Sequence, residues 1–246
     1  MAAKAKKLGR HARLVTAAPR VLEARLAEVR AQEGAALEAA PDPESVHVMR
    51  VATRRLRAAL QLFGAPRALP AELKQLQDAL GAVRDAQLHR RWLGGELPVR
   101  CRALHQAVRS FRARTVPRLV KLELAPRGRL GGHRMRKALR RKLGAVEKRI
   151  AAGALEPLQA HQLRIAVKKL RYRAELLRRA LGLDDLLEEL EPLLEALGKL
   201  HDLDVRRELE PGVAGARREA KAAALARVLA RWRERKLARS FRHALR

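Results

Sequence analysis

Two short runs of basic residues, each opened by a histidine, carry the side chains best suited to chemistry in this sequence. The runs comprise His47, Arg50, Arg54 and Arg57, and His161, Arg164, Lys168 and Arg171. On an α-helix each run falls within about 80° of one face and extends over about 15 Å. Neither run is interrupted by an acid. Because guanidinium groups bind phosphate oxygens through pairs of parallel hydrogen bonds, this arrangement indicates an anion site.

An ordinary solvated helix face is the alternative interpretation of these runs. Surface helices usually mix charges, because like charges four residues apart destabilise a helix by a few tenths of a kcal/mol. Here the like charges occur in both runs, and most of the 55 Lys and Arg residues of the chain are arginines. The repetition favours phosphate binding over plain solvation.

The two histidines admit three roles, as structural residues, metal ligands or donors to phosphate oxygens. A metal role is the weakest of the three. Neither His47 nor His161 has a His, Cys or carboxylate four residues later, and the cations three and seven residues later would repel a divalent ion. We therefore favour phosphate donors over structural residues, and we expect no metal and no other cofactor.

Further basic and acidic residues are weaker candidates for the same site. Arg136 and Arg140 lie one helical turn apart beyond a glycine-rich stretch, and they are additional candidates for anion binding. Asp85 and Asp202 are interpreted as acids that orient the basic residues from an adjacent helix, with an ordinary surface role as the alternative.

The elements that position these residues are predicted to be helices throughout. Ala, Leu, Arg and Glu dominate, and Val and Ile never alternate with polar residues over the length of a strand. Proline, glycine and aspartate divide the chain. The eight predicted helices span residues 19–39, 43–63, 68–93, 99–124, 133–152, 157–182, 184–209 and 213–244.

The sequence also predicts an internal duplication. Residues 46–57 align with residues 160–171, and residues 80–85 align with residues 197–202, in the same order in both halves. We therefore predict an all-α fold of two four-helix bundles related by an internal pseudo-twofold duplication. The predicted domains are a basic N-terminal arm (1–18), a first bundle (19–124), a linker (125–132) and a second bundle (133–246).

Composition narrows the class of partner. The 246 residues include 55 Lys and Arg against 26 Asp and Glu, which gives a formal net charge of +29. Such a chain favours a polyanion, and nucleic acid, anionic lipid and polyphosphate qualify. Only 2% of the residues are aromatic, which disfavours binding of single strands by base stacking. The single cysteine, Cys101, and the absence of a long apolar run favour a cytoplasmic protein without a membrane span.

The paired motifs resemble those of the CHAD domain, the histidine-containing α-helical domain. The resemblance rests on residues 47–58 and 161–172, each followed by a Leu-Gly motif, at residues 80–85 and 197–205. It implies a basic channel or groove between two helical bundles that binds inorganic polyphosphate. The residues that it assigns to binding are His47, Arg50, Arg54, Arg57, His161, Arg164, Lys168 and Arg171, with Arg55 and Lys169 further round the helix.

The sequence departs from the family pattern in its second Leu-Gly motif. Where that pattern has Arg-Asp, the chain has His201-Asp202, and Gln87 stands where the second half keeps Asp204. We expect a non-catalytic polyphosphate-binding protein, located in the cytoplasm and associated with polyphosphate granules. The alternative function is non-specific binding to the phosphate backbone of duplex DNA or RNA.

Overall fold

The computed structural model describes residues 9–93, 101–153, 156–209 and 215–234, together with residues 241, 243 and 245. Within these ranges the regular secondary structure is helical, and one isolated bridge joins Arg13 to Arg129. The all-α prediction is confirmed. No helix in the described ranges is both long enough and apolar enough to cross a membrane.

The chain divides into two compact units at a boundary inside the predicted linker. The first unit contains Ala12–Arg129, and the second contains Leu130–Arg246 together with Gly9–His11. The short N-terminal segment joins the second unit because the backbone N–H of Gly131 donates to the carbonyl oxygen of Arg10 at 3.0 Å.

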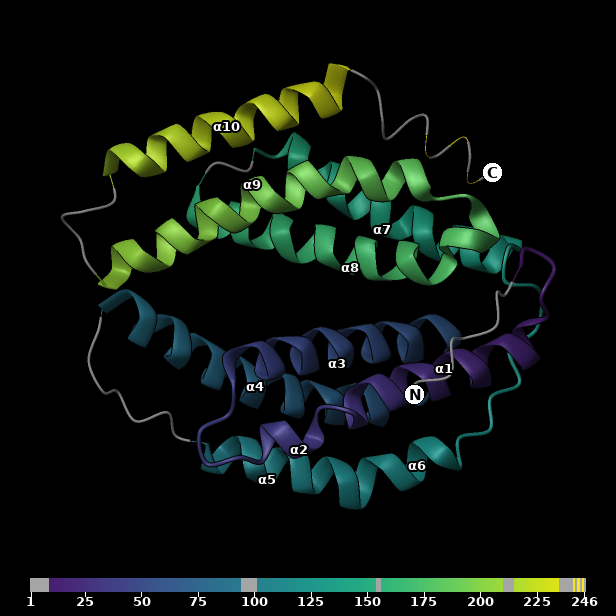
Figure 1. Ribbon diagram of the computed structural model, residues 1–246. Coiled ribbons are helices and arrows are strands. Elements are labelled where there is room, and N and C mark those ends of the chain that lie inside the picture. The colour runs from purple at the N-terminus through teal and green to yellow at the C-terminus, as the bar shows by residue number, and fades with distance from the viewer. Residues whose placement is uncertain are drawn as a thin grey trace. The chain divides into compact units, whose positions relative to one another are not determined.

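The described secondary structure elements of the first unit are all helices (Figure 1). Its elements are α1 (Leu14–Arg30), α2 (Glu33–Ala36), α3 (Pro43–Phe63), α4 (Ala68–Leu93), α5 (Arg102–Ser110), the π-helix η1 (Phe111–Thr115) and α6 (Val116–Val120). Helix α3 packs against both α1 and α4, so it lies at the centre of this unit.

The described helices of the second unit are each at least 19 residues long (Figure 1). They are α7 (His133–Ala151), α8 (Pro157–Leu181), α9 (Asp184–Leu209) and α10 (Gly215–Glu234). Helix α8 packs against α7 and α9, and α10 packs against α9. The α8–α9 pair therefore occupies the place in this unit that the α3–α4 pair occupies in the first.

Three predicted helices differ from the structure in their bounds. Helix α1 begins at Leu14 rather than at residue 19, so the last five residues of the predicted basic arm are helical, and Pro19 lies inside the helix. Burial of Leu14, Ala17 and Ala18 anchors this first turn. The helix then ends at Arg30, before the short α2, instead of continuing to residue 39.

The other two differences concern the fourth and eighth predicted helices. Residues 99–124 form α5, η1 and α6 in direct succession, because the helix widens to a π-helical turn at Phe111–Thr115 and ends at Val120. The predicted helix 213–244 is described as α10 over Gly215–Glu234, and most of its remaining residues lie outside the described ranges.

The α3–α4 pair and the α8–α9 pair, which we call the two hairpins, begin with helices whose ends carry the same local signals. Helices α3 and α8 each have a proline in their first turn, where a missing backbone N–H costs nothing. Each ends at a glycine in the left-handed region, Gly64 with φ 82° and Gly182 with φ 61°, a conformation that glycine adopts without strain. These signals explain why the predicted bounds of both helices agree with the structure to within one residue.

Candidate functional site

The first basic run forms one face of α3, which we name the first basic face (His47, Arg50, Arg54 and Arg57). His47 is exposed and the three arginines are half-buried. On the other side of the helix Met49, Leu56 and Leu60 are fully buried in the core of the first unit. Because the apolar side is held in the core, the basic side is fixed at the surface.

Arg57 is held in place by α4. Its Nη1 donates to Oε1 of Gln77 at 3.0 Å. Burial lowers the pKa of Arg57, Asp78 raises it, and Arg54 lowers it further. The arginine remains charged, because its ordinary pKa lies far above neutrality. A neutral amide therefore positions Arg57 without cancelling its charge.

Arg50 also reaches across to α4. Its Nη2 lies 3.7 Å from the position that a Cβ on Gly81 would occupy, so the guanidinium lies beside this buried glycine of α4. Gly81 belongs to the first Leu-Gly motif, and the neighbouring Leu80 is fully buried. The motif thus joins the two helices of the hairpin at the level of the first basic face.

The second basic run forms the equivalent face of α8, which we name the second basic face (His161, Arg164, Lys168 and Arg171). All four of its side chains are half-buried. Arg171 donates from Nε to Oε1 of Glu175 at 3.0 Å, and its Nη2 lies 4.0 Å from Oε1 of Glu191 on α9. No acid interrupts the run in the sequence, but these two acids partly neutralise its last arginine.

The second face gains a further imidazole from α9. The ring centroids of His161 and His201 lie 5.2 Å apart, with the rings inclined by 46°. His201 is half-buried. Burial is the largest cause that lowers the pKa of His201, to about 4, and the neighbouring Arg164, His161 and Lys168 lower it further, while Asp204 raises it. The imidazole of His201 is therefore neutral at pH 7.

The remaining predicted residues lie near these faces or beside them. Arg55 is half-buried on α3, and Lys169 is exposed on α8. Arg136 and Arg140 are both half-buried on α7, and Nε of Arg136 donates to the carbonyl oxygen of Gly131 at 3.0 Å. Arg136 therefore also fastens the first turn of α7 to the preceding loop.

Two residues that lie beside the basic faces, Gln77 and His201, were not predicted as part of the site. Gln77 carries no signal in the sequence, because an amide at a helix surface is common. His201 has a signal, because it aligns with Arg84 in the duplicated motif and so marks a basic position. The acid predicted to orient the first face, Asp85, is exposed and makes no ion pair with a described residue of α3.

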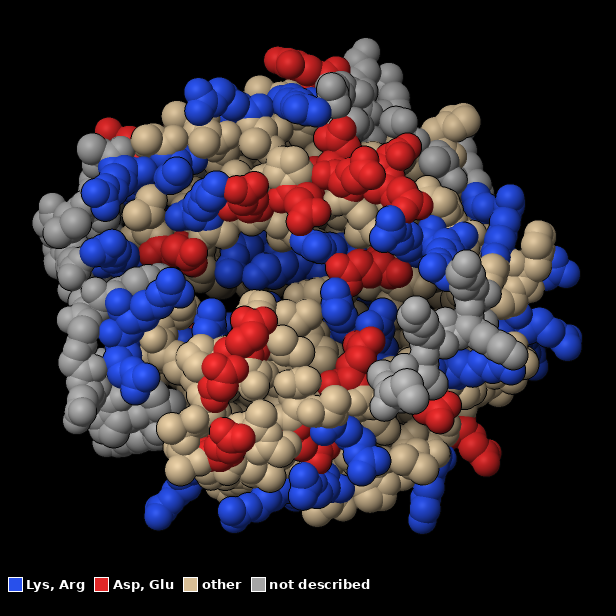
Figure 2. All heavy atoms as spheres, in the orientation of Figure 1, with Lys and Arg blue, Asp and Glu red and all other residues tan. Residues whose placement is uncertain are grey.

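Acidic side chains gather elsewhere in the second unit. Figure 2 shows them over the N-terminal half of α9, and the residues of this patch are Asp184, Asp185, Glu188, Glu189, Glu191 and Glu195. Several are paired with cations, as Asp184 is with Arg178 and Glu195 is with Lys199. The patch meets the second basic face at its last residue, Arg171, which lies near Glu191, whereas His201 lies further along α9.

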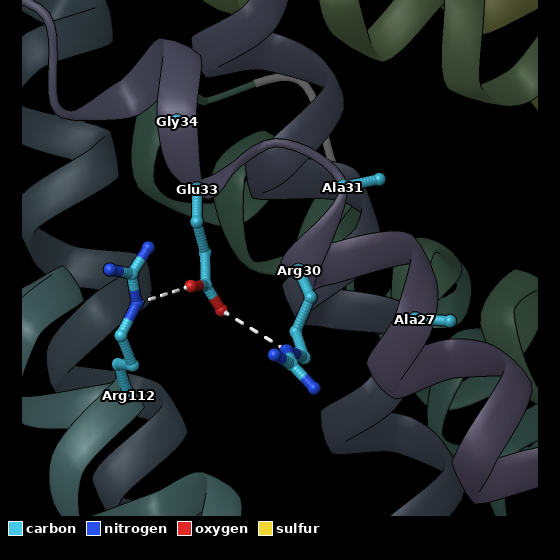
Figure 3. Close-up of a pocket in the computed structure, with 6 residues that line it drawn as sticks. All are labelled: Ala27, Arg30, Ala31, Glu33, Gly34 and Arg112. Carbon is cyan, nitrogen blue, oxygen red and sulfur yellow. Dashed lines mark hydrogen bonds and ion pairs between the residues drawn. The ribbon is translucent and has the colours of Figure 1, made fainter.

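A concave site in the first unit is structural in character (Figure 3). An open cleft of about 590 Å³ lies beside Glu33, whose carboxylate accepts a hydrogen bond from Nε of Arg112 at 2.8 Å and lies 4.0 Å from Nε of Arg30. Glu33 is 3% exposed. Because the acid joins α1, α2 and η1, it holds three elements together. Among the described residues, no three His, Cys, Asp or Glu side chains form a metal site.

The comparisons with known proteins point to one family. The sequence matches the CHAD domain family over residues 20–211. It is similar to the crystal structure of the CHAD domain from the plant Ricinus communis, with 26% sequence identity and a TM-score of 0.64, covering 100% of this chain and 97% of that chain. The comparison with curated proteins gives no match.

Proposed function

Because the chain belongs to the CHAD domain family, which is associated with polyphosphate binding, we propose that it binds inorganic polyphosphate through the two basic faces. The observation that carries the proposal is the repetition of one design. In each unit a central helix buries its apolar side and presents a histidine and three cations on the opposite side. Phosphates spaced along a chain match cations spaced along a helix.

The proposed activity is binding without catalysis. The four side chains of each face are three cations and one imidazole, with no carboxylate among them, and cations of this kind stabilise bound phosphates. Arginine supplies most of the contacts, and its planar fork engages two phosphate oxygens at once. The predicted channel between the bundles remains a prediction that rests on the family resemblance.

We also propose that the protein acts in the cytoplasm and associates with polyphosphate granules. A fluorescent fusion should then coincide with the granules in cells that accumulate polyphosphate and spread evenly in cells that do not.

A competition titration tests the binding. Labelled long-chain polyphosphate bound to the protein is displaced by unlabelled polyphosphate or by duplex DNA, at matched phosphate concentration and physiological salt. We expect polyphosphate to compete at least tenfold better, because the cations of each face lie along one side of a helix and match a single chain of phosphates. Equal displacement by DNA would contradict the proposal and favour non-specific binding by the net charge of +29.

A further inference from the structure

His201 places a second titratable ring in the second basic face. It lies on α9, and its ring centroid is 5.2 Å from that of His161 on α8. Arg164 and Lys168 lie one and two turns along α8 from His161, and their positive charges lower the pKa of His201. Two imidazoles and two permanent cations therefore form a compact cluster on the α8–α9 hairpin.

The charges around His201 leave it short of a counterion. The nearby acid that raises the pKa of His201 is Asp204. The carboxylate of Asp204 accepts a hydrogen bond from Nε of Arg218 on α10 at 2.6 Å. The side chains of this ion pair are only 13% and 15% exposed. Because Arg218 already balances Asp204, protonation of His201 adds a positive charge to a cluster that is positive already.

The first hairpin has a permanent cation in the same register. Arg84 on α4 aligns with His201, and its Nη1 donates to the carbonyl oxygen of Pro43 at 3.4 Å. The first hairpin thus carries a guanidinium where the second carries an imidazole. The two hairpins differ in whether this charge depends on pH.

We propose that His201 is a further binding residue of the second basic face, and that this face binds phosphate together with a proton that the His161–His201 pair takes up from water. This inference rests on the proposed polyphosphate binding. The bound phosphate supplies the negative charge that the cluster lacks, and the protonated ring donates a hydrogen bond to a phosphate oxygen. In the first hairpin the position aligned with His201 is Arg84, which is permanently charged, so no proton is taken up there when phosphate binds.

The sign of the pH dependence follows from linkage. In the free protein the ring of His201 is neutral above about pH 4. A bound polyanion favours the protonated ring and raises its pKa towards the ordinary value of about 6.5. Between these two values binding takes up a proton, so the affinity rises as the pH falls from 7 to 5.

Titration calorimetry measures the number of protons that the protein takes up when polyphosphate binds. Long-chain polyphosphate is titrated into the whole protein at pH 5.5 and pH 7.5, each in two buffers that differ in ionisation enthalpy. Long chains are used because their internal phosphates do not titrate in this range. At pH 5.5 we expect the wild type to take up about one proton more on binding than a His201→Arg variant does. At pH 7.5 we expect the wild type to bind polyphosphate about tenfold more weakly than this variant, whose arginine is permanently charged.

Two further variants separate the outcomes. His201→Gln should keep at pH 5.5 the weaker affinity that the wild type shows at pH 7.5, while His243→Gln, which changes an exposed histidine near the C-terminus, should behave as the wild type. Circular dichroism confirms that each variant is folded. In addition, an NMR titration follows the ring of His201 with and without polyphosphate, which tests the coupling in the unmodified protein.

Each result decides one of the two proposals. Polyphosphate binding with equal proton uptake in the wild type and in His201→Arg, or an NMR pKa of His201 that polyphosphate does not raise, would overturn the coupling and leave the proposed function intact. No binding of polyphosphate at either pH would overturn the proposed function and the coupling together.

Discussion

The α3–α4 and α8–α9 hairpins share a spacing of basic residues but differ in the groups around it. In the first hairpin Arg57 is held by the neutral Gln77, and the aligned position on α4 is the permanently charged Arg84. In the second, Arg171 is held by Glu175, and the aligned position on α9 is His201. The first hairpin therefore carries more positive charge that does not change with pH. The positive charge of the second hairpin is reduced by its acids and depends on pH.

This difference shows that equal spacing does not make two sites electrostatically equal. A repeat preserves the side chains that one helix presents, whereas their charge in the folded state depends on the helix packed beside it. The following predictions test this contrast between the hairpins, from the largest expected effect to the smallest.

Charge reversal at matched positions should affect the two hairpins unequally at neutral pH. Arg54→Glu and Lys168→Glu replace aligned cations, and we expect each to weaken polyphosphate binding 10- to 100-fold, or about 1.5–3 kcal/mol. At pH 7.5 the loss should be larger for Arg54→Glu, because the first hairpin carries more of the constant charge. At pH 5.5 the two losses should converge, as measured by titration calorimetry.

A control pair separates the faces from the total charge. Arg20→Glu on α1 and Arg227→Glu on α10 change the net charge by the same amount at exposed positions, one in each unit. They should weaken binding less than threefold. A loss as large as that of the two face variants would mean that binding depends on the diffuse field of the whole protein.

Truncation of the last arginine of each face should give a smaller and again unequal effect. Arg57→Ala is expected to weaken binding about tenfold, and Arg171→Ala about two- to threefold, because Glu175 and Glu191 already share the charge of Arg171. Conversely, Glu175→Gln should strengthen binding. Equal losses for the two arginines in the same titration would show that the acids do not weaken the second face.

Removal of a helix cap should affect stability and leave binding unchanged. Asp42 accepts a hydrogen bond from the backbone N–H of Ser45 at 2.8 Å and so caps α3, whereas Glu156 makes no such bond at the start of α8. Asp42→Ala should lower the free energy of unfolding by about 1 kcal/mol, and Glu156→Ala by much less. Urea denaturation measures both values, and a polyphosphate affinity changed by Asp42→Ala would speak against a purely local role.

The helices of both hairpins could be predicted from the sequence because their ends are encoded locally. Pro43 and Pro157 begin α3 and α8, and Gly64 and Gly182 end them in a conformation that other residues rarely adopt. The basic faces could be predicted as well, since they follow from 3.6 residues per turn. The start of α1 at Leu14 could not, because burial of its apolar side outweighs Pro19 only in the folded unit.

By itself the sequence determined the all-α class, the CHAD family, the ends of the central helices and the side chains that each basic face presents. These properties depend on residues close together in the chain. Only the tertiary structure decided that Gln77 positions Arg57, that Glu191 of α9 lies near Arg171 and that His201 meets His161. Such pairings depend on how two helices pack, and packing sets the burial and the neighbouring charges on which the protonation of a histidine depends.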